Sequence, residues 1–234
     1  EHDNILRKFC IPEAFWPKIR HSWSYEKDLT MSGRLDLAVK GQDIKVFEYN
    51  ADSASVLVEI AVIQEKWAEK MNLERNIMSG FQLHHILVKN WEQFSSIKLV
   101  HILIDDDNDE LLTASYMQNV LKEANIDSKL CMMTNDLYWK DSKIIDNDGH
   151  QVELIWKLWM WETIFSDYIQ CEKEGTLMRK IDDEHPHLCQ IFFNDHIKII
   201  EPLWKVIPSN KAILPILWLL YPNHPYLLRS EYSL

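Results

Sequence analysis

Four polar residues flanking one predicted turn carry the most informative chemistry in this sequence. Arg34 and Asp36 alternate with apolar residues before the turn at residues 40–43, and Glu48 and Asn50 alternate with apolar residues after it. Side chains two positions apart on a β-strand share a face. If the hairpin pairs residues whose numbers sum to an even value near 84, Asp36 lies opposite Glu48 and Arg34 opposite Asn50, and all four side chains share one face.

Two carboxylates and an amide oxygen on one patch are ligands that a hard cation prefers. Magnesium takes oxygen ligands in octahedral geometry and commonly keeps water and phosphate oxygens among them. A neighbouring guanidinium such as Arg34 can bind a phosphate oxygen and stabilise charge on a transferring group. The same pattern also fits a solvated polar face with an arginine–carboxylate ion pair, which is common on half-exposed sheets. The pattern alone leaves both interpretations open.

The opposite face of this hairpin consists of large apolar side chains. Leu35 and Leu37 stand on the first strand, and Phe47 and Tyr49 stand on the second. We therefore expect this face to be buried, as one face of an antiparallel pair usually is.

Hydrophobic periodicity predicts two helices after the hairpin. Residues 54–72 and 81–94 carry apolar residues at helical spacing, with charged residues on the other side. Asp52 or Ser53 is the expected N-cap of the first helix, because both side chains can accept a hydrogen bond from a free backbone N–H.

The middle of the chain predicts an α/β fold. Residues 99–104 form an apolar run typical of a buried parallel strand, and a helix at 110–124 followed by a strand at 129–132 completes a βαβ unit. Residues 143–146 and 151–157 alternate on either side of a turn and predict a second hairpin.

The charge balance restricts the class of partner. Acidic residues outnumber basic ones by 36 to 25, which gives a formal net charge of −11. Nucleic-acid binding requires a basic surface, so we expect no nucleic-acid partner. An acidic surface suits a polyamine or a metal–nucleotide complex, although solubility alone also explains the charge.

The cysteines and the hydropathy indicate an intracellular protein. Four cysteines stand far apart, and no CxxC pair predicts a zinc ribbon or a thioredoxin-like site. We expect reduced, mostly buried thiols and a cytoplasmic location. No apolar run reaches the ~18 residues of a membrane span, so we expect no membrane partner.

Three stretches resemble the synthetase domain of the glutathionylspermidine synthase family and occur in the family's order. The first comprises the two halves of the hairpin, SGRLD at residues 32–36 and FEYNADSAS at 47–55. The others are IWKLWMWET at residues 155–163 and IEPLWKVIPSNKAILP at 200–215.

The resemblance implies an ATP-dependent carbon–nitrogen ligase. In this family ATP phosphorylates the glycine carboxylate of glutathione, and an amine of spermidine attacks the resulting acyl phosphate. The implied small molecules are therefore ATP, a glutathione-like peptide and a polyamine, with two Mg²⁺ ions as cofactors. A related ligase for another acid and amine, and an inactive binding or scaffold protein with the same architecture, remain as alternatives.

The resemblance also implies roles for individual residues. Arg34 would stabilise the γ-phosphate and the acyl phosphate, and the two Mg²⁺ ions would be held by Asp36, Glu48 and Asn50. The implied substrate-binding residues are Ser53, Ser55, Glu162, Asn210 and Lys211. For Glu162, a role as a carboxylate at the start of a helix is an equal alternative. For Asn210, a helix N-cap formed by Ser209 or by Asn210 itself is an equal alternative.

The expected architecture is a pre-ATP-grasp layer joined to part of a circularly permuted ATP-grasp domain. Residues 97–157 would form the Rossmann-like βαβ layer, and residues 1–234 a partial synthetase domain. In the family the lysines and the lid that grip the nucleotide follow the last motif. We therefore expect the C-terminal nucleotide-binding half to be missing here and this chain alone to be inactive.

Overall fold

The computed structural model describes residues 2–73, 80–132 and 134–232. The chain divides into two compact units. Unit 1 consists of residues 1–54 and 201–234, and unit 2 consists of residues 55–200.

Unit 2 is built on a parallel sheet with the order β4-β3-β7-β8. Its strands are β3 (Leu99–Ile104), β4 (Asp127–Met132), β7 (Leu154–Lys157) and β8 (Lys198–Ile200). The helix α5 (Asn108–Glu123) connects β3 to β4. This arrangement confirms the predicted buried parallel strand, the βαβ unit and the mixed α/β class.

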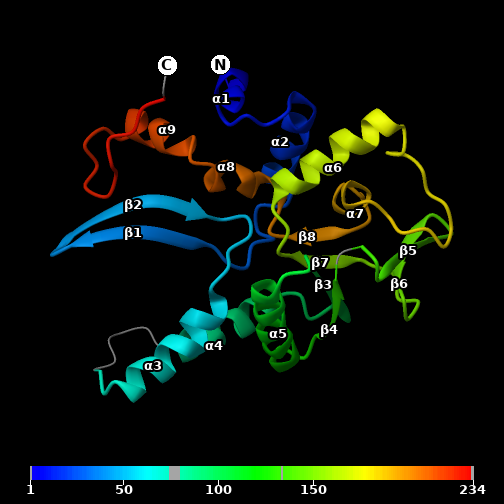
Figure 1. Cartoon of the computed structure of the whole chain (residues 1–234), viewed down its shortest axis with the longest axis horizontal. Coiled ribbons are helices and arrows are strands. Elements are labelled where there is room, and N and C mark those ends of the chain that lie inside the picture. Colours follow the sequence, from blue (N-terminus) through cyan, green and yellow to red (C-terminus); the bar gives the residue numbers. More distant parts are fainter. Residues whose placement is uncertain (1, 74–79, 133, 233–234) are drawn as a thin grey trace. The chain divides into compact units, whose positions relative to one another are not determined.

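Helices cover both faces of this sheet (Figure 1). From the central strands the chain moves outward in opposite directions, through α5 to β4 and through α6 (Trp161–Glu174) and α7 (Leu188–Phe192) to β8. Right-handed crossovers in opposite directions place their helices on opposite faces. The strand order therefore reverses between β3 and β7, and open α/β sheets bind ligands at the carboxyl ends of the strands at such a point.

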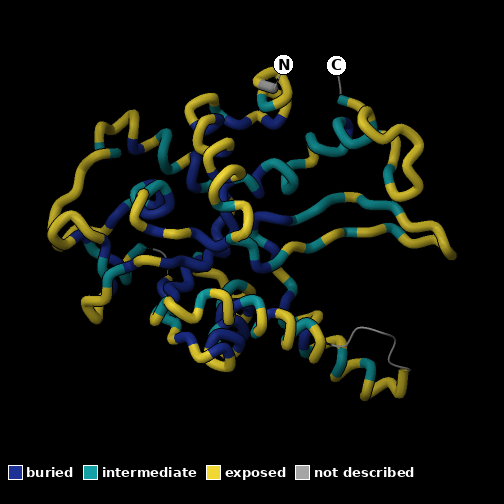
Figure 2. Tube along the Cα trace, turned by 180° about the vertical axis from the view of Figure 1, so that it is seen from behind, coloured by how far each residue is buried: buried dark blue, intermediate teal, exposed yellow. Residues whose placement is uncertain are grey.

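The core of unit 2 lies on the central strands. All four residues of β7 are buried, and so are the last five residues of β3. Figure 2 shows the burial continuing along the neighbouring backbone. A strand buried on both faces reads as a continuous apolar run rather than an alternating one, which is why 99–104 was predictable.

The predicted second hairpin is wrong in its partner. Residues 143–146 form β6 (Lys143–Asp146), which pairs with β5 (Leu137–Lys140), while 154–157 enters the parallel sheet. The two-residue loop of Asp141 and Ser142 has φ of 49° and 62°, the backbone of a tight hairpin turn. The chain does return beside β6 for a short stretch. The Asp146 N–H donates to the His150 carbonyl oxygen and the Val152 N–H to the Ile144 carbonyl oxygen, both at 2.9 Å, around a bridge between Ile145 and Gln151.

The first predicted helix starts later than expected. Helical backbone begins at residue 57 and continues through a π-helical segment (Glu59–Ile63) into α3 (Gln64–Lys70). Val56 has a φ of 68°, outside the right-handed helical region, so the helix cannot extend back through it. Asp52 and Ser53 therefore lie too early to cap the helix. The second predicted helix is confirmed as α4 (Gly80–Glu92).

Unit 1 combines the N-terminal helices, the first hairpin and the C-terminal segment. Its helices are α1 (His2–Lys8), α2 (Trp16–Tyr25), α8 (Val206–Ser209) and α9 (Ile213–Leu220). The hairpin consists of β1 (Arg34–Lys40) and β2 (Asp43–Asn50). The Val46 N–H donates to the Tyr226 carbonyl oxygen at 2.8 Å, which ties β2 to the C-terminal segment.

The predicted burial of the apolar hairpin face is wrong for most of its length. Leu35, Leu37 and Phe47 are 54%, 46% and 51% exposed. The C-terminal segment contacts β2 at Lys45 and Val46, but the tip of the hairpin is exposed in Figure 2 and no described element covers most of this apolar face. Tyr49, at the base, is half-buried.

Across the described ranges, no helix is both long and apolar enough to cross a bilayer.

Candidate functional site

The hairpin register brings the four chemistry-bearing residues together as predicted. Arg34 pairs with Asn50 and Asp36 pairs with Glu48. Since all four are paired or two residues apart, they share one face of the hairpin. The register shifts between Asp36 and Leu37, and this shift places Asp36 opposite Glu48 rather than opposite Phe47. Gly41 makes the turn with a φ of 63°, a conformation that glycine adopts without strain.

The two carboxylates are close together and each contacts a cation. Arg34 binds Asp36 through two nitrogens, Nε to Oδ1 at 2.8 Å and Nη2 to Oδ2 at 3.3 Å. The Lys211 ammonium lies 2.7 Å from Glu48 Oε2. Hydrogen bonding from Arg34 is the main cause of the lowered pKa of Asp36, which Glu48 also contacts.

Asn50, the last residue of β2, completes the group. Its Nδ2 donates to Glu48 Oε1 at 3.3 Å, so its amide oxygen is turned away from that carboxylate. Arg34, Asp36, Glu48 and Asn50 are all partly exposed, so small molecules can reach them.

This donor set fits Mg²⁺. Two carboxylates held within contact of each other require a counter-charge, which Arg34 and Lys211 supply here. The Lys211 side chain is 75% exposed and belongs to the short segment between α8 and α9. An exposed lysine pair is weak, so a divalent cation can replace it at Glu48.

A buried ion pair fixes the segment that leads into β1. The Glu201 carboxylate accepts the backbone N–H groups of Met31 and Ser32 at 3.2 and 2.9 Å. Lys205 donates to Glu201 and to the Ser32 carbonyl oxygen, and both charged side chains are almost fully buried. Glu201 has a φ of 70°, which is strained for a non-glycine residue. This pair positions the backbone directly before Arg34.

Two further contacts fix the base of the hairpin. A Cβ at Gly33 would lie 2.5 Å from the Tyr49 hydroxyl oxygen, so the close approach of that ring requires glycine. The Ser209 hydroxyl accepts the backbone N–H groups of Ala51 and Asp52 at 2.9 and 2.7 Å, just beyond Asn50. A cavity of about 530 Å³, lined in part by Gly33 and Tyr49, lies beside this base.

Sequence reasoning missed Glu201, Lys205 and Ser209 as supports of the site. The signal was present, because Glu201 and Lys205 are four residues apart in a motif already singled out.

The other predicted substrate residues divide between the units. Ser53, Asn210 and Lys211 belong to unit 1, and Ser55 and Glu162 belong to unit 2. The Asn210 side chain donates to the Phe9 carbonyl oxygen at 3.0 Å and accepts the Ala212 N–H at 2.9 Å, so its amide holds local backbone. Of this group only Lys211 contacts the hairpin carboxylates through an identified ion pair.

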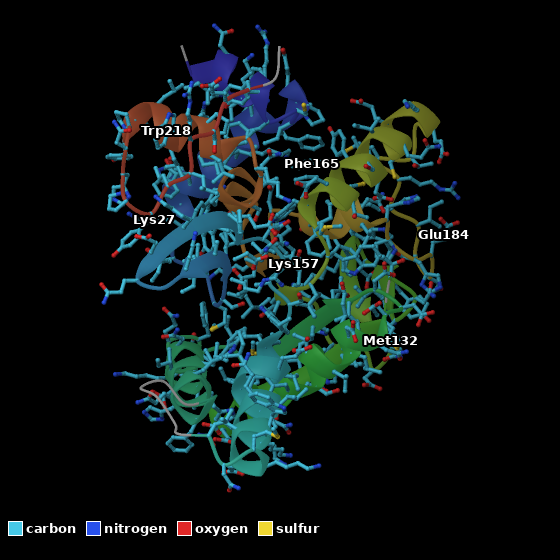
Figure 3. The ribbon with its side chains drawn as sticks, turned by 60° about the vertical axis from the view of Figure 1, so that its left-hand side comes forward. Lys27, Met132, Lys157, Phe165, Glu184 and Trp218 are labelled. Atoms are coloured by element: carbon cyan, nitrogen blue, oxygen red, sulfur yellow. The ribbon has the colours of Figure 1, made fainter. Side chains whose placement is uncertain are left out.

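Glu162 stands near the carboxyl edge of the parallel sheet. It is exposed in the first turn of α6, five residues after the end of β7 at Lys157. Lys157 is fully buried, donates to the Trp159 carbonyl oxygen at 2.8 Å and lies 5.0 Å from the centre of the Trp161 ring. Figure 3 shows Lys157 among the interior side chains. Glu162 is thus a carboxylate beside the point where the strand order reverses.

Comparison with known proteins identifies close sequence relatives. A protein-family model described as glutathionylspermidine synthase preATP-grasp matches residues 1–233. A trypanothione synthetase from Crithidia fasciculata is 40% identical over 240 residues, which cover 99% of this chain and 37% of that protein. The bifunctional glutathionylspermidine synthetase/amidase of Escherichia coli K12 is 35% identical over 236 residues, with coverage of 99% and 38%.

A glutathionylspermidine synthase from Crithidia fasciculata is 28% identical over 246 residues, which cover 96% of this chain and 33% of that protein. The chain thus spans between 33% and 38% of the length of these three relatives.

Proposed function

This chain belongs to the glutathionylspermidine synthase family, through its pre-ATP-grasp part, and on that premise we propose that it forms part of an ATP-dependent carbon–nitrogen ligase. The observation that carries the proposal is the hairpin register, which gathers Arg34, Asp36, Glu48 and Asn50 on one accessible face.

The proposed reaction joins the glycine carboxylate of glutathione, or of a similar peptide, to an amine of spermidine. ATP would convert the carboxylate to an acyl phosphate, and the amine would then displace phosphate to form the amide. A carboxylate attacks an anionic triphosphate poorly, so the barrier depends on neutralising charge at the reacting phosphate.

Each residue of the hairpin face has a part in this scheme. Asp36, Glu48 and the Asn50 amide oxygen would hold two Mg²⁺ ions, which when bound neutralise phosphate charge. Arg34, freed from one of its contacts with Asp36, would donate to the transferring phosphoryl group. The buried Glu201–Lys205 pair keeps the backbone before Arg34 in place, which preserves the alignment of the guanidinium.

The polyamine and the peptide would contact residues outside the hairpin face. Glu162 would attract an ammonium group of the polyamine, since it is an exposed carboxylate at the carboxyl edge of the sheet. Ser53 and Ser55 would contact the thiol peptide, and Asn210 and Lys211 would line the substrate channel. Lys211 supports this assignment best, because it already reaches Glu48.

The decisive test is Glu48→Gln in the complete gene product that carries this chain. We expect the variant to lose Mg²⁺-dependent ADP formation by a factor of about 10²–10³, because the amide is uncharged and no longer balances a divalent cation. Asp43→Asn is the matched control, since Asp43 lies on the same strand at its exposed far end.

The outcomes separate the rival functions. Full activity in Glu48→Gln would show that Glu48 is not a required Mg²⁺ ligand. ADP formation coupled to amide formation with glutathione and spermidine would establish both substrates, whereas ADP formation with another acid and amine would indicate a related ligase. ATP binding without turnover in the unaltered protein would indicate a scaffold.

A further inference from the structure

A second group of metal-ligating side chains lies in unit 2, between α6 and α7. Asp167 and Cys171 are four residues apart on α6 and therefore share a helix face. His187 directly precedes α7. The carboxylate oxygen, the sulfur and the ring nitrogen that these residues offer all lie within 4.8 Å of one another.

Cys189 places a second sulfur beside this group of three. It lies in the first turn of α7, and its thiol interacts with the Asp167 carboxylate and with Cys171. Its backbone N–H also donates to Asp167 Oδ2 at 2.8 Å. Both cysteines are 1% exposed, so two thiols meet in the interior beside a carboxylate and an imidazole.

The spacing suits a tetrahedral metal ion. Bonds of about 2.0–2.3 Å in a tetrahedral zinc site place neighbouring donor atoms about 3.3–3.8 Å apart. His187 Nδ1 lies 3.8 Å from Asp167 Oδ1. Sulfur and imidazole ligands select a borderline-soft ion such as Zn²⁺ over Mg²⁺ or Ca²⁺, which prefer oxygen.

The backbone around the group is fixed by contacts that need no metal. The Gln190 side chain accepts the His187 N–H at 3.0 Å and donates to the Arg179 carbonyl oxygen at 2.7 Å. Gly175 ends α6 in the left-handed conformation, and residues 176–187 return to α7. Figure 3 labels Phe165 on α6 and Glu184 in this returning segment. Preorganised ligands bind a metal with less loss of conformational freedom.

The group is accessible on one side. The side chains of His187 and Asp167 are 43% and 25% exposed, which gives an ion a route to the buried sulfurs. Burial, followed by the neighbouring Asp167 carboxylate, raises the pKa of the Cys189 thiol. Metal binding would displace its proton, as thiolate coordination requires.

We propose that Asp167, Cys171, His187 and Cys189 bind one zinc ion that joins α6 to α7. Two ligands belong to α6, one belongs to α7 and His187 directly precedes α7, and these helices pack together. The ion would therefore close the segment between them. This site is independent of the proposed ligase chemistry, because its ligands and those of the hairpin are different residues in different units.

A second cluster of metal-ligating side chains in unit 2 is already contacted by a lysine. Asp146, Asp148 and His150 also bring their donor atoms within 4.8 Å of one another. The Lys129 ammonium, however, contacts both of those carboxylates, at 3.1 and 2.5 Å. A cation therefore already occupies that position, which makes this cluster an internal comparison.

The test is a titration of the reduced chain with Co²⁺ in excess Mg²⁺, followed by displacement with Zn²⁺. We expect one Co²⁺ per chain, with the intense visible bands of a tetrahedral ion and a sulfur-to-cobalt charge-transfer band. Cys171→Ser and Cys189→Ser should each weaken binding by about 100-fold or more and diminish the charge-transfer band. Cys10 and His185 lie outside the group, so Cys10→Ser and His185→Gln should leave the Co²⁺ affinity and the charge-transfer band unchanged.

A second readout covers variants that fold poorly. Zn²⁺ should raise the unfolding temperature of the unaltered chain, and this shift should vanish in His187→Gln, whose partly exposed side chain can be replaced without a cavity. The proposal is overturned if the reduced, unaltered chain gives no charge-transfer band. It is equally overturned if the band survives in the Cys171→Ser/Cys189→Ser double variant, or if Asp148→Ala removes binding.

Discussion

At the scale of single residues, the Lys211 ammonium contacts Glu48, the carboxylate that we propose as a metal ligand. The two groups are 2.7 Å apart, and the hydrogen bond to Glu48 is the main cause of the raised pKa of Lys211. Because the lysine competes for that carboxylate, we expect Lys211→Gln to tighten Mg²⁺ binding to the nucleotide-free chain about two- to fivefold.

Titration calorimetry at low ionic strength measures this change directly. Lys45→Gln is the matched control, since Lys45 lies on the same hairpin but donates to the carbonyl oxygens of Pro225 and Leu227. Equal or weaker Mg²⁺ binding in Lys211→Gln would mean that the lysine and the metal do not share Glu48.

The buried Glu201–Lys205 pair provides a second prediction for single residues. Removing one charge of a buried pair leaves the other without compensation, so Glu201→Gln and Lys205→Met should each lower the free energy of unfolding by about 3–5 kcal/mol. The double variant should lose less than the sum of the two single losses. Urea unfolding of the three variants completes the cycle, and strictly additive losses would show that the two charges act separately.

At the scale of elements, one turn in unit 2 depends on a single carboxylate. Asp146 is buried, accepts the backbone N–H groups of Asp148 and His150 at 2.9 Å each, and lies 3.1 Å from Lys129 and 3.2 Å from His101. Burial alone would raise the pKa of Asp146, but the hydrogen bonds from His150, Lys129 and His101 outweigh it and lower that pKa. The charged form therefore stabilises the fold.

The lowered pKa sets the direction of a pH dependence. A carboxyl group with a lowered pKa in the folded state contributes stability above its unfolded pKa of about 3.9, and that contribution disappears as the pH falls below it. Asp146→Asn should therefore lower the free energy of unfolding by about 2–3 kcal/mol at neutral pH, with a smaller difference at about pH 3. Urea unfolding across this range, with the exposed Asp127→Asn as control, would contradict the prediction if the difference stayed constant.

Local signals explain which elements were predictable. The turn at Gly41 and the alternation on both sides of it predict the first hairpin, but not its full register. The turn pairs Lys40 with Asp43, and continuing that register would place Asp36 opposite Phe47; the shift after Asp36 places it opposite Glu48 instead. The run 154–157 looked like the second arm of a hairpin, yet its four residues are buried in a parallel sheet. Such a short apolar run fits either role, and only its partners β3 and β8, distant in the sequence, decide between them.

The exposed apolar face and the cysteine group show what no local pattern could reveal. Leu35, Leu37 and Phe47 have the alternation of a buried face, but their burial depends on whether another element covers them. Cys171 and Cys189 are separated by a returning segment, so their meeting follows from the packing of α6 on α7. Tertiary contacts of this kind override sequence periodicity.

At the scale of the whole molecule, the chain crosses between the two units twice, and a strained residue marks each crossing. The units meet in sequence at residues 54–55 and 200–201. Val56 and Glu201, beside these crossings, have φ of 68° and 70°, a region that non-glycine residues rarely occupy. In Glu201 the buried ion pair with Lys205 compensates for this strain.

The division also predicts which part of the chain folds by itself. Residues 55–200 are continuous and contain the complete parallel sheet with α5 on one face and α6 and α7 on the other, whereas unit 1 requires two separate segments. We therefore expect a piece spanning 55–200 to unfold cooperatively in urea, with circular dichroism typical of an α/β domain.

A shorter piece, 55–187, is the matched control for this prediction. It lacks α7 and β8, so β7 becomes an exposed edge strand and α6 loses the helix that packs against it. It should lose the cooperative transition, and it should also lose Co²⁺ binding, because Cys189 is absent. Non-cooperative unfolding of the 55–200 piece would mean instead that its sheet depends on unit 1, and that the two units fold only together.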